Sequence, residues 1–157
     1  MSIVKFSTNY LGELEELKQL KARYFRFIDT KDFERLPEVF TEDYVYADDA
    51  KERIIEGRDA FVNFIVGRHT DSVSVHQGYM PELEILSESE ARGVWAMSDV
   101  VILPNTRNGR LIQRGNGHYH ERYRKQDGVW RIEYTHLTRV WLSIEEQFEE
   151  FPNVLSK

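Results

Sequence analysis

A chain of 157 residues with 41% hydrophobic and 13% aromatic side chains has the size and composition of one globular domain. Its net charge of −6 argues against nucleic acid or an anionic membrane as a partner, because both require a concentrated basic patch. The lack of cysteine excludes disulfides, thiolate metal ligands and cysteine nucleophiles. A small-molecule partner fits better, and we expect a cytoplasmic protein because no leader pattern or membrane-length apolar run occurs.

The first segment with a clear hydrophobic period is a helix. From Leu11 to Ile28, apolar residues recur every three or four positions, which places them on one helical face. The residues of this face are Leu11, Leu14, Leu17, Leu20, Tyr24 and Ile28. Asp32 is a suitable cap for a second, short helix that runs to Phe40 and bends at Pro37.

A short strand and a third helix come next. The segment from Tyr44 to Tyr46 predicts a strand, and residues 54–55 return after a polar turn. The third helix is expected to begin near Arg58 or Asp59 and to end at Gly67.

From residue 70 onward the hydrophobic period changes to two, which is the period of β-strands. The predicted strands are Val73 to His76, Leu83 to Leu86, Ala91 to Leu103, Leu111 to Lys125 and Val129 to Trp141. The longest of them imply curvature or bulges in the sheet. We therefore expect one α+β domain over residues 1–157, with three N-terminal helices followed by a curved antiparallel sheet. Its core spans about residues 10–141, and an acidic tail over residues 142–157 carries Phe148, Phe151 and Val154.

The pair Asp127-Gly128 predicts a two-residue hairpin turn, because a type I′ turn needs positive φ at both central positions. Such a turn sets Gln126 opposite Val129. The pairs that follow are Tyr123 with Ile132, Glu121 with Tyr134, and Tyr119 with His136. These residues share a face with Trp130, whereas the opposite face carries Arg122, Arg124, Arg131 and Glu133. The first face is therefore expected to be buried.

The same alternation applies to the strand from Ala91 to Leu103. It places Trp95, Met97, Asp99 and Val101 on one face. Because Asp99 lies among large apolar residues, its carboxylate must be paired or functional, unless a bulge turns it toward water.

Asp29 and His76 are the first candidates for chemistry, and each has a structural alternative. Asp29 directly follows the first helix and could simply cap the next one. His76 ends a predicted strand, where a histidine can be a hydrogen-bonded structural residue. An imidazole takes up a proton near neutral pH, and a carboxylate on its other nitrogen stabilises the product. The two residues would therefore form an acid-base pair if the fold brought them together.

His118 and His120 suggest a metal site, because residues two apart on a strand share a face. That face also carries Arg122 and Arg124, and no carboxylate follows at a suitable position. We therefore expect no metal and no cofactor.

Four segments carry a family resemblance: RYFRFIDTKDFERLPEVFTEDYVY, EGRDAFVNF, SVHQGYMPELEI and GHYHERYRKQDGVWRI. In this order, over about residues 10–141, the chain resembles the SnoaL-like branch of the nuclear transport factor 2-like superfamily. Within that branch it is most similar to the group of scytalone dehydratase, bile-acid dehydratases and hexachlorocyclohexane dehydrochlorinase. The resemblance implies a cone-shaped curved sheet around a small-molecule pocket, and a homo-oligomer, either dimer or trimer.

The resemblance also implies roles for residues. Asp29 would orient His76, which would act as general base or acid. The substrate-binding candidates are Tyr46, Trp95, Asp99, Tyr119, His136 and Arg139, the last of which could hold an acidic group. Met97 and Asp99 stand where the fungal dehydratase has a second histidine, and Ile28 stands where it has a tyrosine. Scytalone itself is therefore not the expected substrate. Asp99 could replace the second histidine as an acid-base partner, as the resemblance to the bile-acid enzymes implies.

The function that these expectations favour is a cofactor-independent lyase of the dehydratase type, acting on a small hydrophobic cyclic substrate. An isomerase or a cyclase would begin with the same proton abstraction, so the residues do not separate these reactions. A binding or oligomerisation domain without catalysis is the alternative from another class.

Overall fold

The computed structural model describes residues 9–105 and 109–147. Its elements, in chain order, are α1 (Tyr10–Asp29), the 3-10 helix η1 (Leu36–Val39), β1 (Phe40–Asp48), the 3-10 helix η2 (Asp49–Lys51), β2 (Arg53–Glu56), α2 (Arg58–His69), β3 (Val73–Ile85), β4 (Glu90–Asn105), β5 (Gly109–Gln126) and β6 (Val129–Gln147). The predicted tail begins inside β6, and its residues Phe148, Phe151 and Val154 lie outside the described part of the chain.

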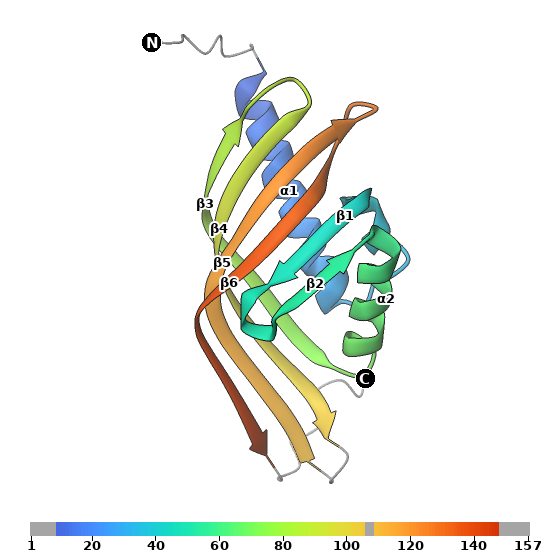
Figure 1. The fold of residues 1–157 in the computed structure, drawn as a ribbon, viewed down its shortest axis with the longest axis vertical. Helices are drawn as coiled ribbons and strands as arrows, with labels where there is room; N and C mark the ends of the chain where they lie inside the picture. The colour runs from blue at the N-terminus through green and yellow to red at the C-terminus, as the bar shows by residue number, and fades with distance from the viewer. Residues whose placement is uncertain (1–8, 106–108, 148–157) are drawn as a thin grey trace.

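The six strands form one curved sheet in the order β2-β1-β6-β5-β4-β3 (Figure 1). α1 runs along one face of the sheet, and α2 lies beside β1 and β2. β1 pairs in parallel with β6, while the other neighbours pair antiparallel, so the prediction of an antiparallel sheet was wrong at this one junction.

The second predicted helix was also wrong, because residues 32–40 form turns, η1 and the start of β1. The backbone N–H of Asp32 donates to the carbonyl of Phe27 at 2.8 Å, and that of Lys31 donates to Ile28 at 3.2 Å. Lys31 adopts a left-handed φ of 63°. These features close the C-terminus of α1. Asp32 therefore helps to end one helix instead of starting another, and the described residues contain two α-helices rather than three.

Two further boundaries differ from the prediction. α2 continues through Gly67 to His69, so the last two residues are held on a helical turn. β3 is one strand of 13 residues where two strands and a turn were expected. A register shift between Tyr79 and Glu82, next to Pro81, bends this strand without interrupting it. As a result His76 lies within the strand and pairs with Asp99 of β4.

The β5–β6 hairpin starts as predicted. Asp127 and Gly128 have φ of 52° and 76°, and Gln126 pairs with Val129. A bulge between Arg122 and Tyr123 then leaves Glu133 as the extra residue on β6. Beyond it the pairs are Arg122 with Tyr134, Glu121 with Thr135, His120 with His136, and Tyr119 with Leu137. The predicted partners Tyr134 and His136 were therefore wrong.

The core lies between α1, α2 and the inner face of the sheet. Leu17, Leu20 and Ile28 of α1 are fully buried, as their spacing predicts. Leu11, by contrast, is 79% exposed. Because nine residues span two and a half helical turns, Leu11 points away from the side on which Leu20 lies. No helix within residues 9–105 and 109–147 is long and apolar enough to cross a membrane.

One charged network is built into this core, and we call Lys21, Glu121, Tyr123, Trp95 and Thr135 the Lys21 network. Lys21 Nζ donates to Glu121 Oε1 at 2.5 Å, and both side chains are buried. Thr135 also donates to Oε1, while the Tyr123 hydroxyl donates to Oε2 at 2.6 Å. The Trp95 indole N–H donates in turn to the Tyr123 hydroxyl at 2.8 Å. Each carboxylate oxygen therefore has donors, and the ammonium lies over the Tyr119 ring at 3.7 Å.

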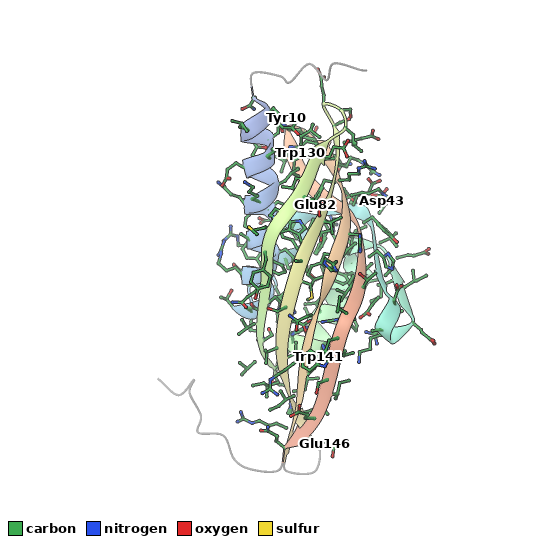
Figure 2. All side chains as sticks on the ribbon, turned by 90° about the vertical axis from the view of Figure 1, so that its left-hand side faces the viewer. Tyr10, Asp43, Glu82, Trp130, Trp141 and Glu146 are labelled. Atoms are coloured by element: carbon green, nitrogen blue, oxygen red, sulfur yellow. The ribbon has the colours of Figure 1, made fainter. Side chains whose placement is uncertain are left out.

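In Figure 2, Tyr10 and Trp130 lie toward one end of the molecule, and Trp141 and Glu146 toward the other. Glu13, in the first turn of α1, joins the helix to the first of these ends. Its carboxylate accepts hydrogen bonds from Lys125 and from the Trp130 indole N–H. These contacts hold α1 in line with the strands, so that its last residue, Asp29, reaches β3.

Candidate active site

A polar cavity of about 50 Å³ lies between α2, the C-terminal half of α1 and the inner face of the sheet. This volume holds a few water molecules. The predicted site residues that line it are Tyr46, His76, Asp99, Tyr119 and Arg139. All six strands and both α-helices contribute residues to the lining. A larger ligand needs side chains at the rim to move.

Asp29 faces β3 and not the segment that follows α1. Its Oδ1 lies 2.7 Å from His76 Nδ1 and accepts the hydroxyl of Ser74 at 2.9 Å. Its Oδ2 accepts the backbone N–H of His76 at 2.8 Å. Since both oxygens bind residues of β3, the alternative in which Asp29 caps the next helix does not describe this side chain. The carboxylate instead fixes the end of α1 to the strand that carries the imidazole.

The contact with Asp29 also fixes which nitrogen of the His76 ring faces the carboxylate. An ionised carboxylate can only accept, so Nδ1 carries the hydrogen and Nε2 has the free lone pair. The ring stacks on Phe25, with planes 6° apart and centroids 6.3 Å apart, and the His76 side chain is 8% exposed. His76 is therefore an oriented imidazole on the cavity lining, a suitable arrangement for proton transfer.

Asp99 is bound to Arg139 by two hydrogen bonds. Arg139 Nη1 and Nη2 donate to the two carboxylate oxygens at 2.8 and 2.7 Å; the Asp99 side chain is buried and that of Arg139 is mostly buried. Burial opposes the charge on Arg139, but the hydrogen bonds and the negative charge of Asp99 outweigh it and raise the pKa of the guanidinium. Each group is thus already partnered, which makes Asp99 a fixed anion and Arg139 its counterion.

The tyrosines of the cavity keep their protons. Burial is the main cause that raises the pKa of Tyr46 and Tyr119 above the ordinary value. The Tyr46 hydroxyl donates to Asp48 Oδ2 at 3.3 Å. Asp48 Oδ1 is buried and has no hydrogen-bond partner in the described part of the chain. The cavity therefore offers both hydroxyl donors and a carboxylate oxygen that can accept one more hydrogen bond.

His69 is a second imidazole in the lining that sequence reasoning missed. Its ring centroid lies 5.7 Å from that of His76, and its Nδ1 lies 3.1 Å from the Ser72 hydroxyl. That hydroxyl donates to the His69 carbonyl and accepts from Lys31, so it receives the Nδ1 hydrogen. Burial, followed by nearby positive charges, lowers the pKa of His69 to about 3. His69 is consequently a neutral residue near physiological pH.

Two predicted site residues lie elsewhere. Trp95 is buried in the Lys21 network, where its indole N–H is bound to Tyr123. His136 lies on the outer face because of the β-bulge, and its Nε2 is 2.7 Å from Asp49 Oδ1. Neither residue lines the cavity. The structure thus brings six of the eight candidates together, with Asp29 directly behind His76.

The cavity also includes residues without a sequence-based prediction: Asp48, Lys51, Arg53, Arg68, His69 and Gln113. Arg68 and His69 were missed because Gly67 suggested a helix end, although the helix continues beyond it. Gln113 and Tyr119 are separated by an even number of positions on β5, so both side chains point to the inner face of the sheet. The alternation along this strand was a usable signal for Gln113. Among the described residues, no group of three or more histidine, aspartate or glutamate side chains could hold a metal ion.

Comparisons with known proteins agree with this architecture. A family model described as a SnoaL-like domain matches residues 9–136. A protein of unknown function from Mycobacterium tuberculosis is 29% identical, with a TM-score of 0.69, and the match covers 86% of this chain and 77% of that one. A candidate scytalone dehydratase from Novosphingobium aromaticivorans is 19% identical, with a TM-score of 0.74 over 94% and 97% of the two chains. A type 2 hexachlorocyclohexane dehydrochlorinase is 15% identical, with a TM-score of 0.75 over 92% and 97%.

Proposed function

This chain belongs to the SnoaL-like domain family, and we propose that it is a cofactor-independent lyase of the dehydratase type acting on a small hydrophobic cyclic substrate. The names of two structural neighbours, a dehydratase and a dehydrochlorinase, support an elimination reaction. The family and these neighbours together support a small-molecule enzyme of lyase or isomerase type. The finer assignment depends on the residues of the cavity.

The observation that carries the proposal is the 2.7 Å contact between His76 Nδ1 and Asp29 Oδ1 at the wall of a polar cavity. Positioned acid-base catalysis requires this kind of geometry and contributes about 10²- to 10⁴-fold to a reaction rate. Because Asp29 is itself held by Ser74 and by the backbone of β3, the imidazole keeps one orientation.

In the proposed reaction, His76 Nε2 removes a proton from the carbon next to a substrate carbonyl. The electrons of that C–H bond form the new double bond, and the bond to a hydroxyl on the neighbouring carbon breaks. The imidazolium, stabilised by Asp29, then gives its proton to the departing hydroxide, which leaves as water. The substrate loses one water molecule and the histidine returns to its neutral form.

Tyr119 is the proposed donor to the substrate oxygen, and Tyr46 joins it where that oxygen replaces Asp48 Oδ2 as the acceptor of the Tyr46 hydroxyl. Since the pKa of each is raised, they stay protonated and can donate to an oxygen on which negative charge develops. Arg139 is the proposed source of a fixed positive potential beside this oxygen, while Asp99 holds the guanidinium in place. Asp99 is less suited to proton transfer, because both of its oxygens accept from Arg139.

Two alternatives have specific support. An isomerase would use the same proton abstraction, and its product would keep the mass of the substrate. A binding or oligomerisation domain without catalysis is favoured by the small size of the cavity, about 50 Å³, since ligand pockets commonly enclose about 300–1,000 Å³. A homo-oligomer and the absence of a cofactor are part of the proposal.

The test is a screen of cyclic β-hydroxy ketones with the wild type, His76→Ala and Asp29→Asn, in which loss of water is followed by mass spectrometry. We expect a fall in kcat/KM of about 10²- to 10⁴-fold in both variants, with folding checked by circular dichroism. The matched controls are His136→Ala and Asp49→Asn, which alter a histidine-carboxylate pair of the same 2.7 Å distance on the outer face. Equal turnover by the wild type and His76→Ala would exclude His76 as the base.

A further inference from the structure

Three cationic side chains of the cavity, Lys51, Arg53 and Arg68, have no carboxylate partner in the part of the chain that the structure describes. Within residues 9–105 and 109–147, no aspartate or glutamate lies at ion-pair distance from any of them. Arg139, in the same cavity, is paired with Asp99. A partly buried charge without a counterion is unfavourable, so unpaired cations in a cavity indicate a place for an anion.

The charge of the lining is consistent with this view. Four cationic side chains face two carboxylates, those of Asp48 and Asp99, which leaves an excess of two positive charges. The protein as a whole carries a net charge of −6, so the cavity has the opposite sign to the rest of the chain. Such a local field attracts anionic small molecules.

The two arginines are held at the α2 side of the cavity. Arg53 lies over the Phe64 ring, with its guanidinium carbon 4.6 Å from the ring centroid. Phe64 and Arg68 are four residues apart on α2, so they lie on the same side of the helix. Arg68 Nη2 donates to Gln113 Oε1 at 3.0 Å, which is a neutral partner. The Arg68 side chain therefore reaches from α2 to β5, and its guanidinium has further N–H groups that can donate to a ligand.

The positive charges of Arg53 and Arg68 also repel each other. Burial and then the positive charge of Arg53 lower the pKa of the Arg68 guanidinium. The negative charges of Asp99 and Asp48 act in the opposite direction but are weaker. An anion between Arg53 and Arg68 would remove this repulsion.

We propose that the substrate carries a carboxylate, which Arg68 and Arg53 bind at the α2 side of the cavity while the reacting carbon lies at His76. A planar guanidinium presents parallel donors that match the two oxygens of a carboxylate. His69 follows Arg68 directly, and its ring lies 5.7 Å from that of His76. Arg68 and His76 both line the cavity, and a ring substrate that contacts both needs side chains at the rim to move, because the free volume is about 50 Å³. This inference rests on the proposed lyase function and specifies its substrate class.

The test is isothermal titration calorimetry with benzoate, cyclohexanecarboxylate and naphthoate, each measured beside its own neutral amide. We expect the wild type to bind at least one carboxylate about 10- to 100-fold more tightly than its amide, the range of charged hydrogen bonds. Arg68→Gln and Arg53→Gln are each expected to reduce this preference about tenfold or more, while amide binding stays unchanged. Arg68→Lys should retain part of the preference, because the charge remains and the paired donors are lost.

The matched control is Arg92→Gln, which removes an exposed arginine of β4 that is paired with Glu84 of β3. It should leave the carboxylate preference unchanged. The proposal is wrong if no carboxylate is favoured over its amide, including the case in which neither binds. It is also wrong if Arg92→Gln reduces the preference as much as Arg68→Gln does.

The same measurement with His76→Ala separates this inference from the proposed function. If His76→Ala and the wild type share the carboxylate preference but no substrate is turned over, the anion site stands and the lyase assignment fails. If neutral and acidic cyclic hydroxy ketones are dehydrated equally well, the lyase assignment stands and the anion site fails.

Discussion

The Lys21 network and the cavity around His76 both place charged groups inside the same domain. They differ in how completely the hydrogen bonds of those groups are satisfied. In the network, Glu121 accepts hydrogen bonds from Lys21, Thr135 and Tyr123, and its side chain is buried. In the cavity, Asp48 Oδ1 lacks a partner among the described residues and two arginines repel each other. A completed set of hydrogen bonds supports the fold, whereas an incomplete set beside a cavity is available to a ligand.

The largest stability effect is expected in the Lys21 network. Lys21→Met should lower the free energy of unfolding by about 3–5 kcal/mol, because it leaves the Glu121 charge buried and unpaired. Chemical denaturation measures this change, with Lys18→Met on the exposed side of the same helix as the control. The double variant Lys21→Met with Glu121→Gln should recover much of the loss, since the amide oxygen still accepts from Tyr123. A loss below 1 kcal/mol for Lys21→Met would contradict the view that the Lys21 network supports the fold.

A smaller effect is expected from His69, in the cavity. Its folded pKa of about 3 lies below the ordinary 6.5, so the unfolded state binds the proton more tightly. Its contribution to stability is therefore complete above about pH 6.5 and decreases as the pH falls toward about 3. Between pH 7 and pH 5 the wild type should lose about 2 kcal/mol more than His69→Asn, at about 1.4 kcal/mol per unit of pKa difference. The free energy of unfolding is measured by urea denaturation at each pH. If it changes with pH by the same amount in the wild type and in His69→Asn, this assignment is wrong.

The smallest effect is expected from Trp95→Phe. The change removes one buried hydrogen bond to Tyr123 and part of a packed ring, at a cost of about 1–2 kcal/mol. Since Trp95 lies outside the cavity, the affinity for any ligand should stay the same, as thermal denaturation and calorimetry can check. Trp141→Phe, at a half-exposed ring, is the control and should change stability by less than about 0.5 kcal/mol. Weaker ligand binding by Trp95→Phe would indicate that Trp95 belongs to the binding site after all.

The sequence contains enough to predict much of the sheet and part of the site. Period-two alternation identified the buried residues of β4, and the Asp127-Gly128 turn set the first pairs of β5 and β6 correctly. The bulge at Glu133 left no mark in the sequence, because a glutamate on a solvent face looks the same whether or not it is paired. His136 was misplaced for this reason alone.

The buried charges were harder to foresee. A lysine on an amphipathic helix is usually solvated, so nothing along α1 distinguished Lys21 from Lys18. The partner that makes its burial possible, Glu121, is one hundred residues away in the chain. The meeting of Asp29 with His76 is equally non-local, and the family resemblance rather than the residue pattern anticipated it. Arg53 and Arg68 come together at the cavity only when β2, α2 and β5 are assembled. Their separate positions in the sequence therefore did not identify them as candidates for the site.

The bulge of β6 has a consequence for how this protein can change over time. Which side chains face the interior beyond Glu133 depends on whether the number of residues before them is odd or even. Substituting Glu133 alters one contact, but deleting it would turn Leu137 and Arg139 outward and His136 inward in a single event. The chemistry of this end of the domain is thus protected against point mutation at that position and vulnerable to the loss of one codon.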